Sequence, residues 1–317
     1  MSSGISWNFS VSQIIAALLT TFLFAISAIC GHRSATQIGG VEANFWRAGF
    51  ATLFLAIWAN TLGSGFEGSA FPIFVLSGLA GIGIGDSGYF QALTRLGSRR
   101  TVLLTQCLTA PFAVAIEWAW LKTTLTGMQL VCIAVILVGV GTALAPDDHV
   151  KITPRNLWTG IAACVIAALG GALGAVLSRK AYAVAHAAGE HPDPGTTGYQ
   201  RVIGGAIALG VLLLIVKWRT AHGHGGVGET MKVSRDKWRR IWPLVLANSL
   251  AGQTLGVTCM QWALENTPTG IVTAIISITP IIMFPLTRMI DGERIRPHTL
   301  AGGGIAVAGV IGLTLSH

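Results

Sequence analysis

The sequence predicts an all-α integral membrane protein whose ten transmembrane helices form two inverted five-helix repeats. Three observations predict this class. Hydrophobic residues make up 52% of the chain and charged residues only 11%, with a mean hydropathy of +0.65. Ten apolar stretches can be read, and each approaches the roughly 20 residues that cross a bilayer core. The second half of the chain also repeats the order of features in the first half.

The first predicted repeat covers residues 1–146. Its first apolar stretch is long enough to span and lacks an N-terminal Lys or Arg, so it is interpreted as a helix rather than a signal peptide. The third is rich in glycine, and Pro146 with two aspartates ends the fifth. The expected helices cover residues 11–30, 45–62, 71–93, 101–121 and 128–144.

The second predicted repeat covers residues 147–317. Residues 186–200, HAAGEHPDPGTTGYQ, contain prolines and glycines that should prevent a continued helix. The longest connection, residues 217–240, follows the seventh helix. The expected helices cover residues 158–177, 202–216, 242–264, 270–286 and 300–315.

Paired features support a duplication. Each half has a helix that closes on an Ala-Leu pair and then a helix with a proline, Pro111 or Pro280. Arg47 and Arg201 follow an aromatic residue by two positions, at the expected start of the second and seventh helices. Because five spans is an odd number, the second copy should be inverted relative to the first.

Charge predicts the orientation. All but four of the 21 Lys and Arg residues fall in or beside the connections after the odd-numbered helices. Cytoplasmic connections carry an excess of these residues. The protein is therefore predicted to be a multi-pass protein of the cell membrane with both termini outside the cytoplasm.

Two acids fall inside apolar helices, where an ionised group is costly and usually faces a cavity or a partner. Glu117 is either a coupling carboxylate or an acid near the far interface. Asp86, in the glycine-rich helix beside Tyr89, could bind a substrate amine, exchange a proton, or pair with one of the nearby arginines after that helix.

Other polar groups are candidates for a central site. Gln106 shares a helix face with Glu117, and Gln253, Thr258 and Thr279 offer uncharged hydrogen-bonding groups in the second half. Pro111 and Pro280 should kink their helices and free carbonyls. Arg47 and Arg201 should anchor helix ends by snorkelling or take part in gating.

Other classes of function have little support. The five cysteines lie in apolar stretches without paired spacing. His222 and His224 alternate in a glycine-rich connection that offers no further ligands, and no nucleotide-binding or catalytic motif is present. The sequence predicts no catalytic residue, no metal site, no cofactor and no nucleic-acid partner.

The chain resembles the ten-helix, EamA-type members of the drug/metabolite transporter superfamily over nearly its whole length. The resemblance rests on GDSGYFQAL with LGSRR, on QWALENTPTGIV, on GER at residues 292–294, on GGGIAVAGV and on the two proline helices. It implies a cavity lined by helices 1, 3, 4, 6, 8 and 9. Residues 121–123 depart from the family's usual Gly-Glu turn, and related members are usually drawn with their termini inside.

We therefore expect a secondary transporter that works by alternating access. The expected substrate is a small polar metabolite, with amino acids or their derivatives first, exported in exchange for protons. The alternatives are an organic-cation efflux transporter and an integral-membrane enzyme acting on lipid-linked substrates. The expected partners are this small-molecule substrate, the lipid bilayer and protons, and the protein is expected to be a monomer or a homodimer.

Overall fold

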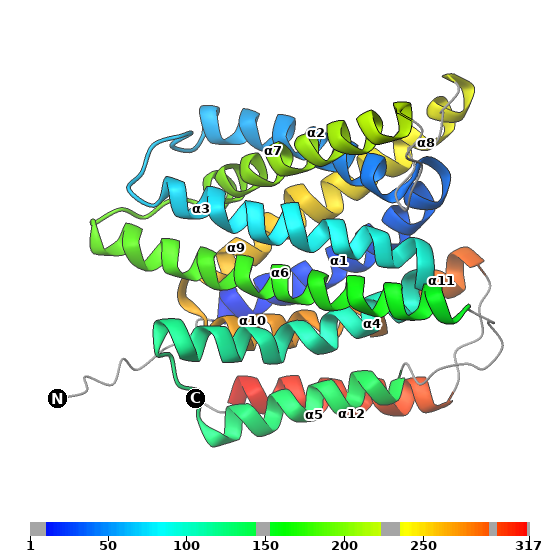
Figure 1. The fold of residues 1–317 in the computed structure, drawn as a ribbon. Helices are drawn as coiled ribbons and strands as arrows, with labels where there is room; N and C mark the ends of the chain where they lie inside the picture. The colour runs from blue at the N-terminus through cyan, green and yellow to red at the C-terminus, as the bar shows by residue number, and fades with distance from the viewer. Residues whose placement is uncertain (1–10, 144–152, 223–234, 292–296, 316–317) are drawn as a thin grey trace.

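The computed structural model describes residues 11–143, 153–222, 235–291 and 297–315, and within these ranges it contains helices and no strand (Figure 1). The first half contains α1 (Val11–Ile38), α2 (Gly40–Thr61), α3 (Phe71–Gly78), the π-helix η1 (Leu79–Gly85), α4 (Asp86–Leu121) and α5 (Gly127–Ala143). The second half contains α6 (Pro154–Ala187), α7 (Pro194–Ala221), α8 (Arg235–Asn248), the π-helix η2 (Ser249–Gly256), α9 (Val257–Asn266), α10 (Thr269–Ile276), α11 (Thr279–Asp291) and α12 (Pro297–Leu315). The predicted all-α class is confirmed for these residues.

Five segments of the described chain are long and apolar enough to cross a membrane: Val11–Ile38, Phe71–Ser98, Arg100–Leu121, Pro154–Ala187 and Pro194–Ala221. The second and third belong to one continuous run that bends at Gly97, where φ is 79°. Shorter apolar segments lie in α5, α10 with α11, and α12. The count of ten spans and the inversion of the repeats stay predictions.

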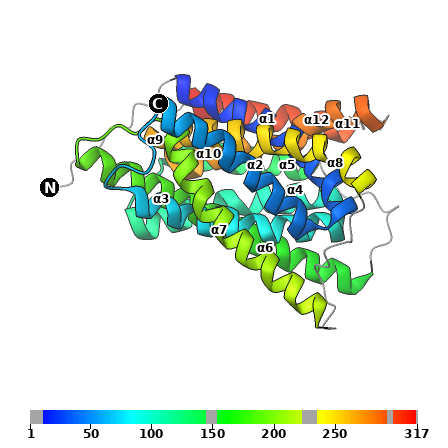
Figure 2. The same ribbon diagram turned by 90° about the horizontal axis from the view of Figure 1, so that it is seen from above.

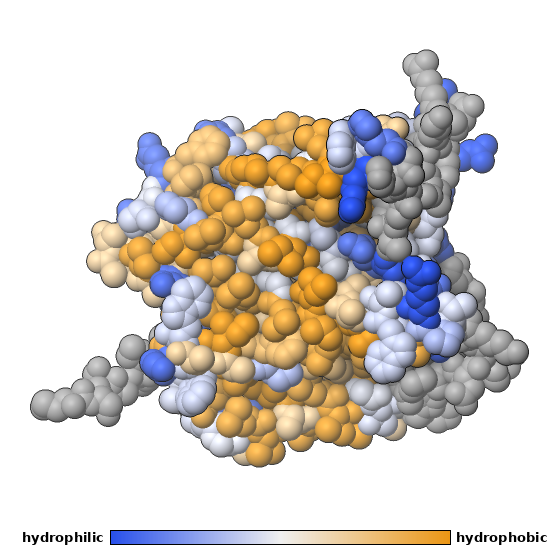
Figure 3. Space-filling view, in the orientation of Figure 1, coloured by the Kyte–Doolittle hydropathy of each residue, from blue (hydrophilic) through white to orange (hydrophobic). Residues whose placement is uncertain are grey.

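The outer surface of the helices is apolar. Leu214, Val138 and Ile57 are 70%, 62% and 57% exposed, and the face in Figure 3 is hydrophobic across its middle with hydrophilic residues toward the two ends of the helices. Water-soluble proteins rarely expose so much continuous apolar surface. These side chains therefore face lipid.

Several helices are longer than predicted, because polar residues continue them beyond the apolar stretches. α1 reaches Ile38, and a single residue with positive φ, Gly39 (89°), turns the chain into α2. The carboxylate of Asp193 caps α7 by accepting the backbone N–H of Gly195 at 3.0 Å. Arg201 consequently lies about two turns inside α7, rather than at its start as predicted.

Helices of one half pack against helices of the other. α2 lies beside α7, and α5 lies beside α12 (Figures 1 and 2). α1 packs against η2 and α9, while α6 packs against η1 and α4. Every one of these contacts joins a segment of one half to a segment of the other, so the bundle interior is shared between the halves.

Glycines set the crossing of η1 and α6. Gly81 and Gly85 are four residues apart and face Gly170 and Gly174, which have the same spacing. A Cβ atom on Gly170 would lie 2.7 Å from the Cα atom of Gly85, and one on Gly174 would lie 2.8 Å from that of Gly81. Paired small residues at this spacing let helix backbones approach closely in membranes.

We expect Gly170→Ala to lower the thermal unfolding midpoint of the detergent-purified protein, since overpacking costs about 1–3 kcal/mol. Gly49→Ala is the matched control, because no atom lies within 4 Å of a Cβ placed there. In the middle of a helix this second change should stabilise by roughly 0.5–1 kcal/mol. Equal shifts of the two midpoints would contradict the close crossing.

Candidate functional site

A cavity of about 160 Å³ lies inside the bundle. Its wall comes from α1, η1, α4, α6, η2, α9 and α10, with one residue each from α2, α7 and α11. At about 15 Å³ per water by the same kind of measure, it has room for roughly ten water-sized groups. Seven of the predicted site residues line it: Arg47, Asp86, Tyr89, Gln106, Arg201, Gln253 and Thr279.

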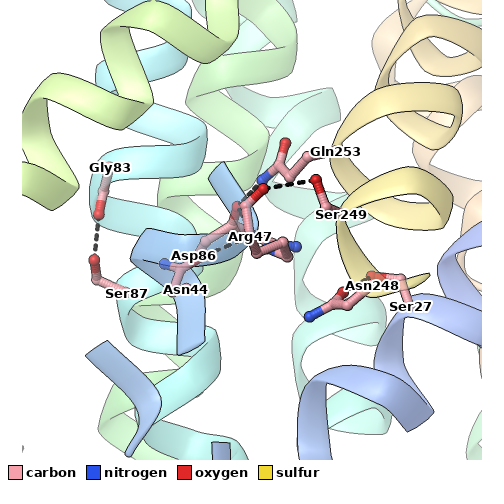
Figure 4. Close-up of polar contacts among 9 residues, drawn as sticks. All are labelled: Ser27, Asn44, Arg47, Gly83, Asp86, Ser87, Asn248, Ser249 and Gln253. Carbon is pink, nitrogen blue, oxygen red and sulfur yellow. Dashed lines mark hydrogen bonds and ion pairs between the residues drawn. The ribbon is translucent and has the colours of Figure 1, made fainter. Parts of the chain in front are cut away.

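An ion pair holds the centre of the site together. Arg47 Nη2 on α2 donates to Asp86 Oδ2 at 2.6 Å, and Gln253 Nε2 on η2 donates to the same oxygen at 2.6 Å (Figure 4). Arg47 also donates to Asn44 Oδ1 at 2.8 Å, and its carbonyl accepts the hydroxyl of Ser249 at 2.8 Å. Asp86 thus pairs with Arg47 from another helix, and not with the nearby arginines that the sequence suggested.

The two π-helices place the polar groups of this cluster. η1 ends at Gly85, directly before Asp86, and η2 contains Gln253. Both π-helices end seven residues before an Ala-Leu pair, at Gly85 and Gly256, so they occupy corresponding positions in the two halves. A π-helix shifts the register of the side chains that follow it, and such segments are frequent at functional sites.

Arg201 is the second cation of the cavity. It is 4% exposed, and its Nη1 donates to Gln261 Oε1 at 3.1 Å. Arg47 is similarly buried at 6%. A snorkelling anchor would reach the headgroups, whereas both guanidinium groups turn into the cavity. Within the described lining, two arginines face one acid, Asp86.

Several hydroxyl groups of the lining were not among the residues predicted from the sequence. Thr105 and Thr109 flank Gln106 on α4 at helical spacing, so the predicted polar face could have included them. Ser27 also lines the cavity and donates to Asn248 Oδ1 at 2.6 Å. These two residues are 221 positions apart, and no local pattern indicates their contact.

Four predicted site residues lie outside the lining: Thr258, Pro111, Pro280 and Glu117. Thr258 in α9 donates to the carbonyl of Thr254 in η2 at 2.7 Å. Pro111 lies within α4 without interrupting it. Pro280 follows the break between α10 and α11, and because it has no N–H, the hydroxyl of Thr279 bonds the carbonyl of Ile276 instead, at 2.5 Å.

The family model described as "EamA-like transporter family" matches residues 11–144 and 158–315. The chain belongs to the EamA-like transporter family. This EamA-like chain is therefore a multi-pass membrane protein from a family of transporters. The membership supports a small-molecule substrate rather than enzymatic catalysis.

A solved structure described as "Crystal structure of protein" has the same fold. It aligns with this EamA-like chain at a TM-score of 0.67 and 15% identity, covering 95% of this chain and 96% of the other. No curated protein sequence matches the chain.

Glu117 lies outside the cavity, at the junction between α9 and α10 of this EamA-like fold. Its Oε2 accepts the backbone N–H of Thr269 at 2.7 Å, at the start of α10. Its Oε1 lies 3.5 Å from Nε of Arg179, whose Nη1 donates to the carbonyls of Leu264 and Glu265 at 3.1 and 2.9 Å, at the end of α9. The negative Glu117 therefore lies at the start of α10 and the positive Arg179 at the end of α9. The helix dipole favours a charge of that sign at each of these ends.

We expect Glu117→Ala to lower the free energy of unfolding by about 3–5 kcal/mol, because it removes the one carboxylate that lies against the buried guanidinium of Arg179. The double variant with Arg179→Ala should be less destabilised than the sum of the two single variants. Thermal unfolding of purified protein in detergent measures both. Additive losses would mean that the two side chains act independently.

Proposed function

We propose that this chain is a secondary active transporter of small polar metabolites that carry an anionic group, with amino acids and their derivatives first. The observation that carries the proposal is the buried cavity with two arginines and one aspartate in its wall. A charged side chain inside a membrane protein is costly, so buried charged residues usually bind a ligand or line a transport pathway. The family supports transport, and the charges support the substrate class.

The balance of charge favours an anionic group in the substrate. Arg47 is already paired with Asp86, whereas Arg201 is bonded to the neutral amide of Gln261. The Nε atoms of both arginines are buried and have no hydrogen-bond partner among the described residues. Guanidinium groups bind carboxylates and phosphates through paired donors. Arg201 is accordingly the group that we assign to the substrate carboxylate.

Asp86 can link substrate and proton. Both of its described hydrogen bonds fall on Oδ2, which leaves Oδ1 for a ligand. A substrate ammonium group and a proton would compete for this carboxylate, because each neutralises the same charge. Such competition yields exchange of one for the other, and with an inward proton gradient it drives the metabolite outward.

Alternating access fits the way in which the two halves share the interior. Corresponding segments of the two halves make corresponding contacts: α1 packs on η2 and α9, and α6 packs on η1 and α4. A site at the meeting of two related halves is typical of transporters built from inverted repeats. Rocking of such segments about the Asp86 cluster would expose the cavity to each side in turn.

Efflux of organic cations is the second candidate. It rests on Asp86 and the neighbouring Tyr89, which could attract a cation. The two arginines in the same wall oppose it, because a like charge at close range repels.

Transport by proteoliposomes tests the substrate and the coupling together. We expect an amino acid, but not an organic cation, to move protons in the opposite direction through the parent protein. Asp86→Asn should abolish proton movement, and Arg201→Gln should raise the half-saturating substrate concentration about 10- to 100-fold, as for loss of a charged hydrogen bond.

Glu67→Gln is the matched control, because Glu67 is an exposed acid outside the cavity. It should behave as the parent does. Transport of cations that survives Arg201→Gln and is lost in Asp86→Asn would establish the second candidate instead. Exchange of labelled substrate without proton movement would contradict the proposed proton coupling but not the proposed transport.

We also propose that both termini lie outside the cytoplasm, as the excess of cations in the odd-numbered connections supports. Ala188, between α6 and α7, and His222, after α7, are exposed at opposite ends of α7. In a variant without native cysteines, Ala188→Cys in intact cells should react with a membrane-impermeant maleimide and His222→Cys should not. The reverse pattern would place the termini inside, and permeabilised cells should label both.

A further inference from the structure

Two histidines and a glutamate meet at one end of the bundle, away from the cavity. His186 lies in the last turn of α6, His191 in the connection to α7, and Glu265 in the last turn of α9. Their nearest ligand atoms all lie within 4.8 Å of one another. The sequence predicted no metal site, because Glu265 follows His191 by 74 positions and no local spacing joins them.

We propose that His186, His191 and Glu265 bind a divalent transition-metal ion of the zinc class. Imidazole and carboxylate are zinc ligands, and three protein ligands leave the fourth tetrahedral position for water. At a metal distance of about 2.0–2.1 Å, two tetrahedral ligands lie about 3.4 Å apart. His186 Nε2 and Glu265 Oε1 already lie 3.5 Å apart.

The ring nitrogen of His186 that faces Glu265 makes an ion-pair contact with that carboxylate at 3.5 Å but no hydrogen bond within the described chain. This nitrogen, Nε2, is buried. Buried polar atoms are nearly always satisfied, and an exception calls for a missing partner such as an ion. The rings of His186 and His191 have their centroids 5.1 Å apart, so the exposed His191 needs only a side-chain adjustment to close the site.

The backbone around the three ligands is fixed by other contacts. Glu190, next to His191, accepts the backbone N–H of Ser69 at 3.0 Å, and Gly189 turns the chain with a φ of 77°. Arg179 holds the end of α9 to α6 through the carbonyl of Glu265 at 2.9 Å. A site supported on rigid elements loses little entropy when a ligand binds. A bound ion would join the end of α6 to the end of α9.

Titration of metal-free, full-length protein in detergent with zinc chloride, followed by calorimetry, tests the site. The titration uses protein without a polyhistidine tag, because such a tag would itself bind zinc. We expect His186→Ala, His191→Ala and Glu265→Gln each to remove one bound zinc or to weaken its binding by at least about tenfold, because changes even to outer-shell partners have this effect. His222→Ala, an exposed histidine at the far end of α7, should bind zinc as the parent does.

Cobalt provides an independent reading of the same site, because its visible absorption reports its coordination. Cobalt bound to the parent should show the intense absorption of a four-coordinate ion, and the three variants should lose it. His191 is exposed, so its variant should fold normally, and gel filtration verifies this for all four. Magnesium should not displace zinc, since it prefers oxygen ligands.

Equal zinc stoichiometry and affinity in the parent and in all three ligand variants would overturn the proposal. An equal loss in His222→Ala would also overturn it. Because binding is measured without any substrate, the result does not depend on the proposed transport function.

Discussion

The bundle depends on balancing a buried charge beside its cavity. Arg47 is almost fully buried on α2, and a lone guanidinium there would be strongly unfavourable. Asp86 balances it, and Gln253 joins the pair through the same carboxylate oxygen. One ion pair thus connects α2, the start of α4 and η2, and the cavity forms around it. Removing either charge would leave the other one uncompensated and so would disturb the packing of these three segments.

This cluster needs backbones that can come close together and helices that can change register. The glycines of η1 and α6 allow the approach, and the two π-helices rotate the following residues toward the interior. The break before Pro280 has a related effect, because it places the hydroxyl of Thr279 beside the cavity. Irregular helical backbone therefore adjoins three polar groups of the cavity wall: Asp86, Gln253 and Thr279.

The helical class, the candidate acid Asp86 and most of the polar lining could be predicted from the sequence, because polar residues inside apolar stretches stand out. The partner of Asp86 could not, since the pattern pointed to the arginines that follow it in the chain, and only the fold brings Arg47 of α2 to it. The extension of α1 and α7 beyond their apolar stretches was missed because polar residues at helix ends look like connections. Glu117 illustrates the same limit: its two partners come from α6 and α10, and only the fold brings them together.

The junction held by Glu117 and Arg179 also bears on how the molecule could be divided into moving bodies. Glu117 belongs to the first half of the chain, while Arg179 and the helix ends they hold belong to the second. A division along the sequence midpoint would have to separate a buried carboxylate from a buried guanidinium in every cycle. Under the proposed alternating access, the boundary between the moving bodies at this end of the bundle should therefore not follow the midpoint of the sequence. The ion pair and hydrogen bonds of Glu117 and Arg179 join the far end of α4, α6 and the α9–α10 junction, which come from both halves.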